Sequence, residues 1–100
     1  MRGLSGTMVS RIAGRGRALG EPTRVRILDV LTRGELTVGH IADAIGSQQS
    51  TASKHLQVLF NAGLVNRRRS ASAVIYSLAS PHIVECIRLL GLSSSSQTRQ

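Results

Sequence analysis

The chain is short and strongly basic, with 100 residues, 41% hydrophobic content and a formal net charge of +8. This length permits one small globular domain with its own core, and no second domain is expected. Arginine supplies 12 of the 13 basic side chains, and its forked guanidinium suits phosphate and guanine contacts, so a polyanionic partner is expected. A charge that only keeps the chain soluble is the alternative.

Cysteine usage and hydropathy indicate a cytoplasmic protein. Cys86 is the single cysteine, which excludes an internal disulfide framework and a CxxC zinc pair. The first 20 residues contain no apolar run long enough for a secretory signal. They are rich in arginine and free of acid, as transit peptides are, but they continue into the domain without a cleavage-like break. No stretch of the sequence reaches the length of a membrane span.

Two helices are expected in the first third of the chain. The near-helical spacing of Met8, Ile12 and Leu19 predicts the first helix. The second begins with Pro22 in its first turn and closes before Gly34. Its apolar stripe consists of Val25, Ile27, Leu28 and Leu31.

A helix-turn-helix is the strongest pattern in the chain. After a short extended link at 36–38, apolar residues recur every three or four positions and predict a third helix that ends at Gly46. A fourth helix is expected from about Gln49 to Ala62, with Gly63 in the C-cap position. The inward apolar positions of the two helices are Val38, Ile41, Ala42, Ile45, Ala52, Leu56 and Leu59. Two short helices that flank a tight turn form this motif.

Beyond the fourth helix the hydrophobic period changes from 3.6 to 2. The segments 64–69 and 73–78 are predicted to form a β-hairpin, or wing, joined by a small polar loop. Pro81 opens a last helix that Gly91 is expected to close, and the tail 93–100 is expected to be disordered. The predicted fold is therefore mainly α with a small β-hairpin: a single winged helix-turn-helix domain over residues 1–100, with about five helices, a two-stranded wing and a core from about 8 to 91.

The outward face of the fourth helix is rich in hydrogen-bonding groups and almost free of acid. Glutamine can pair with adenine, while serine, threonine and lysine reach base edges or phosphate, so this helix is expected to read the major groove. A solvated helix surface is the alternative. The side chains expected to contact DNA are Gln48, Gln49, Ser50, Thr51, Ser53, Lys54, His55 and Gln57. For His55, phosphate contact, capping of a turn and partial burial remain open.

Three consecutive arginines end the first wing strand. Strand alternation places Arg67 and Arg69 on one face and Arg68 on the other, and at least one of them is expected to face phosphate or the minor groove. A charged edge that deters aggregation is the structural alternative. Tyr76 is one of two aromatic residues and is expected in the core or on a phosphate, since so few aromatics argue against single-strand binding by stacking.

Residues 18 to 90 resemble the ArsR/SmtB family of winged-helix regulators, through the segments LGEPTRVRILDVL, ELTVGHIADAIG, QQSTASKHLQVLFNAGLV and VNRRRSASAVIYSL. The resemblance implies a homodimer built from the first and last helices. It implies that two recognition helices enter successive major grooves of an inverted repeat in double-stranded DNA. It also implies repression by covering a promoter.

The chain departs from the metal sensors of this family. Those proteins read ELCVC where this chain reads ELTVG, so Thr37 and Gly39 replace both thiolate ligands. The resemblance is therefore to the metal-independent branch, which includes nodulation-gene and haemolysin-gene regulators, and no metal or cofactor is expected. A metal- or redox-responsive sensor that uses His82, Glu85 and Cys86 on the last helix is an alternative.

Two other functions remain as alternatives. A non-specific architectural or RNA-binding protein would need only the basic charge, and some winged helices are protein-interaction modules. The sequence contains no nucleophile–base pair, carboxylate pair or phosphate-binding loop, so an enzyme is not expected.

Overall fold

Two helices lead the chain, as predicted. In the computed structural model, which describes residues 3–92, α1 spans Gly6–Leu19 and α2 spans Pro22–Leu31. Ser5 caps α1, since its hydroxyl accepts a hydrogen bond from the Met8 amide at 3.1 Å. Glu21 caps α2 in the same way through the amide of Arg24, also at 3.1 Å. These caps satisfy amides that have no partner within the helix.

The helix-turn-helix is confirmed and consists of α3 (Val38–Ile45) and α4 (Gln49–Asn61). Thr37 caps α3 by accepting a hydrogen bond from the amide of His40 at 3.2 Å. Gly46 ends α3 with a φ of +69°, in the left-handed region that glycine enters without steric cost. The chain can therefore turn sharply into α4.

The wing is confirmed, and it has a third strand that the sequence did not indicate. β2 (Val65–Ser70) and β3 (Ala73–Leu78) form the hairpin, and β1 (Leu36–Thr37) pairs with the other side of β3 in the order β1-β3-β2. The expected extended link is thus an antiparallel strand in which Leu36 lies opposite Tyr76. This pairing attaches the wing to the start of α3.

The last helix, α5 (His82–Leu92), begins directly after Pro81. The prediction that Gly91 ends it is wrong, because the helix continues through Gly91 to Leu92, the last described residue. A glycine inside a helix costs only about 1 kcal/mol relative to alanine, so it does not have to stop one. The predicted disordered tail, 93–100, lies outside the described residues. Within residues 3–92, no helix has both the length and the apolar character needed to cross a bilayer.

The core lies between α2, α3, α4 and the sheet. Its largest fully buried side chains are Ile27, Leu28, Ile41, Leu56, Leu59 and Val65. Tyr76 was expected either in the core or on a phosphate. It is 4% exposed, so it belongs to the core. Burial of each such side chain contributes roughly 2 kcal/mol, which makes this cluster the main source of stability.

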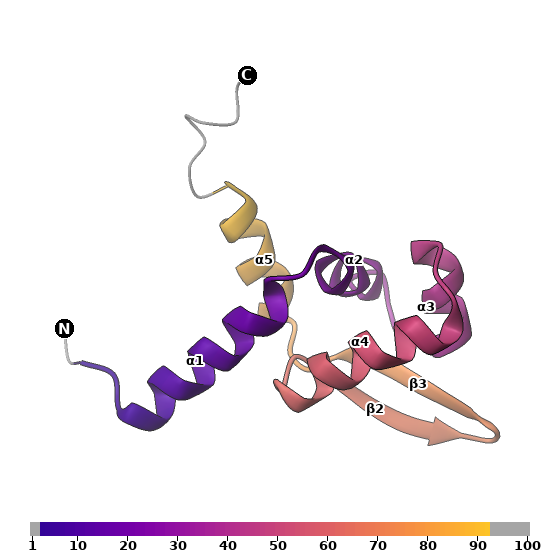
Figure 1. Ribbon diagram of the computed structural model, residues 1–100, viewed down its shortest axis with the longest axis horizontal. Helices are drawn as coiled ribbons and strands as arrows, with labels where there is room; N and C mark the ends of the chain where they lie inside the picture. The colour runs from indigo at the N-terminus through magenta and orange to yellow at the C-terminus, as the bar shows by residue number, and fades with distance from the viewer. Residues whose placement is uncertain (1–2, 93–100) are drawn as a thin grey trace.

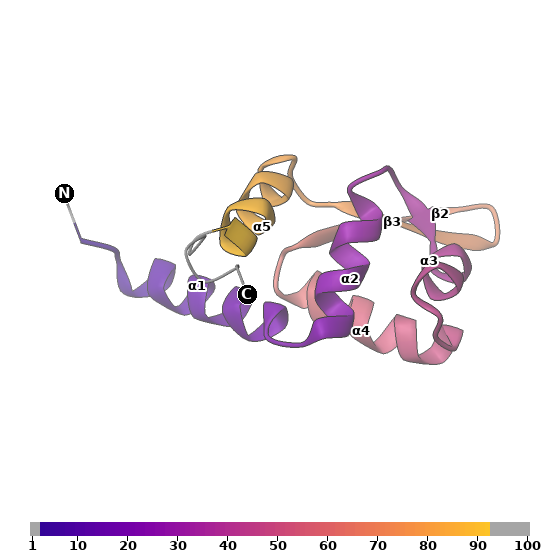
Figure 2. The same cartoon turned by 90° about the horizontal axis from the view of Figure 1, so that it is seen from above.

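α1 and α5 lie at the end of the molecule opposite the tip of the wing (Figures 1 and 2). Large apolar side chains on both helices are exposed, among them Val9 (52%), Ile12 (50%) and Leu89 (53%). Only the C-terminal end of α1 reaches the core, through Ala18 and Leu19. Apart from that end, the apolar face of α1 is left uncovered by the other residues of 3–92.

Candidate nucleic-acid interface

α4 buries one face and exposes the other. Ala52, Leu56 and Leu59 are each 0% exposed and hold the helix against the core. The structure places the following predicted residues on the exposed surface: Gln48, Gln49, Ser50, Thr51, Ser53, Lys54 and Gln57. This face carries donors, acceptors and one cation, with no carboxylate to repel phosphate.

The N-terminus of α4 also favours anions. Gln48 stands at the N-cap, and its side chain makes no capping hydrogen bond. The first amides of the helix therefore have no side-chain cap of their own, and the helix dipole places partial positive charge at this end. Phosphate oxygens are suitable partners for such amides.

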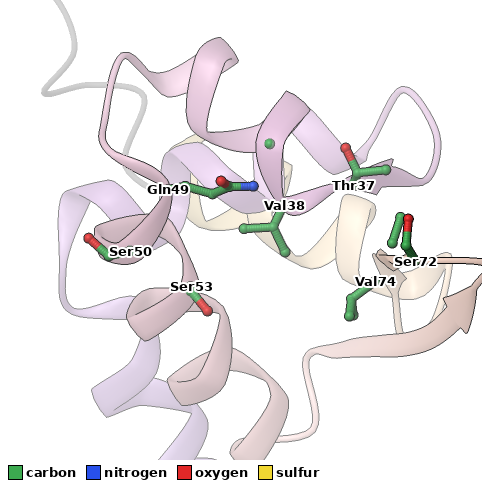
Figure 3. Close-up of a pocket in the computed structure, with 9 residues that line it drawn as sticks. Thr37, Val38, Gln49, Ser50, Ser53, Ser72 and Val74 are labelled. Atoms are coloured by element: carbon green, nitrogen blue, oxygen red, sulfur yellow. The ribbon is translucent and has the colours of Figure 1, made fainter.

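Four elements, β1, α3, α4 and the wing, border an open groove of about 580 Å³ next to these residues. Its lining comes from Thr37, Val38, Gly39, Gln49, Ser50, Ser53, Ser72, Ala73 and Val74. Figure 3 shows Gln49 directed toward the start of α3, with Ser72 and Val74 of the wing across the groove. The sequence pointed to the α4 members only, because nothing local indicates that β1, α3 and the wing tip meet there.

Gly39 leaves room for the side chain of Gln49. A Cβ atom at position 39 would lie 3.2 Å from Gln49 Nε2, which is closer than ordinary van der Waals contact. The absence of a side chain on α3 therefore permits the direction that Gln49 takes. Gly39, at one of the two positions where the resemblance to metal sensors would place cysteine, thus accommodates a glutamine of the exposed face.

Arg67 joins the wing to α4. Its Nη1 donates a hydrogen bond to Gln57 Oε1 at 3.1 Å, and its guanidinium lies 3.8 Å from the centre of the Phe60 ring. Gln57 in turn donates to Asn61 Oδ1 at 3.0 Å. Hydrogen bonding and the cation–π contact hold this arginine toward the helix.

The other two arginines of the wing behave differently. Arg68 points to the opposite face, where its Nη2 lies 2.8 Å from Glu35 Oε2, so the predicted alternation of Arg67 and Arg68 is confirmed. Both partners of that ion pair are about half exposed, and such pairs contribute little to stability. The Arg69 side chain is exposed and makes no hydrogen bond or ion pair among residues 3–92. Of the three, Arg69 has its charge most available to a ligand.

His55 lies apart from the exposed face of α4, in a contact with the start of α2. Its side chain is 21% exposed, and its Nδ1 lies 3.3 Å from Arg24 Nη1 and 4.0 Å from Glu21 Oε1. Arginine can only donate, so the first contact is a hydrogen bond when Nδ1 carries no proton. Phosphate contact, capping of a turn and partial burial were left open for His55, and in the structure it is partly buried.

Glu21 is held as a carboxylate in this cluster. Burial by itself would raise the pKa of Glu21, but backbone hydrogen bonds from Arg24 and Thr23, together with the charges of His55 and Arg24, outweigh burial and lower that pKa below its usual value. The negative charge at the start of α2 is also favoured by the helix dipole.

The residues of the alternative metal site are all on α5. His82, Glu85 and Cys86 are exposed, and Glu85 accepts a hydrogen bond from Arg88 Nη2 at 2.6 Å. This hydrogen bond and the positive charge of Arg88 lower the pKa of Glu85. Within the part of the chain that the structure describes, no three or more His, Cys, Asp or Glu side chains cluster as a metal would require. The assignment to a metal-independent branch stays a prediction.

Sequence comparison relates the chain to bacterial regulators. Residues 21–67 match the family described as bacterial regulatory protein, arsR family. The chain is 37% identical over 84 residues to the HTH-type transcriptional regulator NmtR of Mycobacterium tuberculosis, a match that covers 84% of this chain and 70% of NmtR. It is 40% identical over 72 residues to the cadmium resistance transcriptional regulatory protein CadC homolog of Staphylococcus aureus, covering 71% of this chain and 60% of that protein.

A solved structure has the same fold. The homodimeric winged helix-turn-helix DNA-binding domain of Mb0332 from Mycobacterium bovis, a fragment of residues 1–100, superimposes with a TM-score of 0.85 at 32% identity. The match covers 99% of this chain and 94% of that chain. The winged helix-turn-helix fold expected from the sequence is therefore confirmed.

Proposed function

This chain belongs to the arsR family of bacterial regulatory proteins, and we propose that it is a homodimeric repressor that binds a specific sequence of double-stranded DNA in the cytoplasm. The observation that carries the proposal is the exposed face of α4, which is polar, free of acid and placed beside the groove that the wing completes. A net charge of +8 supplies the long-range attraction to DNA.

In this proposal, side chains of the first turns of α4 contact the bases. Gln49, Ser50 and Ser53 line the groove and lie where recognition helices make most of their base contacts. Gln48, Thr51, Lys54 and Gln57 extend the same surface toward phosphate. On the wing, Arg69 contacts the backbone or minor groove, with Arg67 and Arg68 beside it. His55 acts from behind, through its contact with α2.

Dimerisation through α1 and α5 is supported by their exposed apolar side chains. An apolar groove of about 560 Å³ runs between α1, the turn after α4 and α5, and its members include Ile12, Leu19 and Ile83. Surfaces of this kind mark association sites on small proteins. The homodimeric state of the Mb0332 domain agrees with this assignment. A two-fold dimer would present two α4 helices to an inverted repeat, with half-sites about 34 Å apart.

Repression follows from the simplest use of such a dimer. A protein bound across a promoter excludes the polymerase and needs no surface other than the reading face and the dimer face. Activation requires a further contact with the transcription machinery. Transcription from a template that carries the operator is therefore expected to fall when the protein is added.

We propose that no metal is required. Thr37 and Gly39 stand where thiolate ligands would be needed in the ELTVG segment. The hydroxyl of Thr37 caps α3, and Gly39 has no side chain. One relative is named for cadmium resistance, and His82, Glu85 and Cys86 on α5 carry donor atoms that a metal can use. The metal- or redox-responsive alternative uses those residues.

Selection of bound duplexes from a random DNA pool tests the proposal. The selection is run with wild-type protein alone and then with zinc, with a chelator and with a mild oxidant. Enrichment of one inverted repeat in every condition is the expected result. Enrichment that depends on zinc or oxidant would instead favour the sensor alternative, and no enrichment in any condition would indicate a non-specific binder.

A double substitution then tests the reading helix. Gln49→Ala with Ser53→Ala is expected to lower affinity for the selected repeat about tenfold or more, because each lost base contact contributes roughly 1–3 kcal/mol of discrimination. Affinity for random duplex should change little. Ser10→Ala, which also removes an exposed polar group from a helix, is the control. Unchanged preference in the double variant would show that another element reads the bases.

A further inference from the structure

Arg15 connects α1 to the C-terminal end of α4. Its Nε donates a hydrogen bond to the carbonyl oxygen of Ala62 at 3.0 Å, across 47 positions of sequence. The last carbonyls of a helix have no partner within it, and the helix dipole makes this end negative. A guanidinium is therefore a favourable partner there, and it fixes the end of α4 to the turn of α1 that carries Arg15.

Gly63 provides the space for this contact. A Cβ atom at position 63 would lie 3.0 Å from Nη2 of Arg15, and the residue has a φ of +79°. The glycine therefore meets two demands, the left-handed turn that ends α4 and the close approach of the Arg15 guanidinium. Only the first demand is visible in the sequence.

Arg24 makes a second connection between the same helices. From α2, its Nε donates to the carbonyl of Ala18 at 2.7 Å and its Nη2 to that of Arg17 at 3.3 Å, both at the C-terminal end of α1. Its Nη1 lies 3.3 Å from Nδ1 of His55, in the middle of α4. Figure 2 shows the end of α1 beside α2 and α4. The hydrogen-bond distances place the Arg24 guanidinium between all three helices.

We propose that Arg15 and Arg24 are positioning residues that hold the reading helix α4 at a set place relative to the dimerisation helix α1. This inference rests on the proposed function, in which α1 lies in the dimer interface and α4 reads DNA. Two α1 helices in contact would then determine the separation and angle of the two α4 helices. The two arginines thereby convert dimerisation into a match with one operator spacing.

Affinity for a single half-site and affinity for the full inverted repeat should respond differently to the loss of these contacts, whereas a general loss of stability would lower both. Binding to a single half-site requires one correctly folded α4, whereas binding to the full inverted repeat requires two α4 helices at the correct separation. Loosening α4 from α1 should therefore weaken full-site binding much more than half-site binding. The ratio of the two affinities reports on the connection itself.

The experiment uses the full-length protein and two duplexes of equal length. One carries the selected inverted repeat, and in the other the second half-site is scrambled. Arg15→Gln and Arg24→Gln are each expected to lower the ratio of full-site to half-site affinity about tenfold, the size of a typical coupling between sites. Half-site affinity itself should change less than about threefold.

Matched controls remove the same charge from the same helices. Arg11→Gln lies on α1, where the Arg11 guanidinium contacts only the Met8 side chain among residues 3–92, and Arg26→Gln lies on α2 at an exposed position. Both should keep the wild-type ratio. Sedimentation and circular dichroism establish that each variant is a folded dimer. If Arg15→Gln does not fold, Arg15→Lys retains the charge without the guanidinium fork, and we expect about a threefold lower ratio.

The outcomes distinguish this inference from the proposed function. Wild-type protein with no preference for the repeat, or with equal affinity for both duplexes, would overturn the proposed dimeric reading and the inference with it. Wild-type protein with a strong preference for the full site, together with an unchanged ratio in both glutamine variants, would overturn the inference alone.

Discussion

The two ends of the molecule expose opposite chemistry. At one end, α4 and the wing present polar and cationic side chains over a packed core, so the surface is polar while the inside is apolar. At the other end, α1 and α5 present large apolar side chains over little core of their own. This difference supports the two proposed partners, a polyanion at the first end and a second apolar surface at the other.

The two ends should also respond differently to salt. Contacts with phosphate release counterions, so they weaken steeply as ionic strength rises. Apolar association depends on burial of surface from water and has no such dependence. Raising the salt concentration should therefore release the protein from DNA while leaving it dimeric, and the following predictions test that separation in order of expected effect.

The largest effect is expected at the apolar end. Ile12→Asp and Leu89→Asp each place a charge on the exposed apolar surface of α1 or α5, and burial of an unpaired charge at an interface is costly. Each should raise the dimer dissociation constant about 100-fold or more and remove tight binding to the inverted repeat. Analytical ultracentrifugation and DNA titration measure the two effects.

Ser10→Asp is the matched control for this prediction. It adds the same charge to α1, but Ser10 lies on the opposite side of the helix from Ile12. The control should remain a dimer. Dimers of unchanged strength in both Ile12→Asp and Leu89→Asp would mean that another surface holds the two copies together.

A smaller effect is expected from the arginines of the wing. The Arg69 guanidinium has no hydrogen-bond or ion-pair partner among residues 3–92, so Arg69→Ala should weaken binding to all duplexes alike and reduce the salt slope of log Kd by about one. Arg67 is already bonded to Gln57, so Arg67→Ala should change the salt slope less. Titrations at several salt concentrations compare the two. The reverse order of slopes would place Arg67, and not Arg69, on phosphate.

The smallest effect concerns the carboxylate that caps α2. The pKa of Glu21 is lowered in the folded chain, so this group stabilises the fold above its unfolded pKa, and that contribution is lost as the pH falls through the folded pKa. Thermal unfolding should therefore show a steeper decline of Tm between about pH 5 and about pH 3 in wild-type protein than in Glu21→Gln. Glutamine keeps an oxygen for the cap, which makes it the suitable variant. Parallel pH profiles would contradict the prediction.

Most of the local structure could be predicted, and particular residues show why. Pro22, Gly46 and Gly63 mark helix ends through their own backbone preferences, and the change of hydrophobic period after Gly63 marks the wing. The prediction that the last helix ends at Gly91 was wrong, because glycine permits a helix end without requiring one. The polar face of α4 was also predictable, since a period of 3.6 separates its buried from its exposed positions.

The contacts that position this face were not predictable. Arg67 and Arg69 share a strand face and a residue type, yet the Arg67 side chain meets Gln57 and Phe60 while that of Arg69 has no hydrogen-bond or ion-pair partner in the described chain. No local signal separates the two, because the difference depends on which helix lies opposite each side chain. The pairing of β1 with β3 has the same origin.

The sequence by itself determined the order of the helices, the two strands of the wing and the exposed polar side chains of α4, because those depend on residues within a few positions of one another. Only the tertiary structure decided that Thr37, Gln49 and Ser72 border one groove and that Arg15 reaches Ala62. These side chains meet across the core, over separations at which neither helical nor strand periodicity carries information. Packing of the buried apolar faces brings them together, and their contacts follow from that packing.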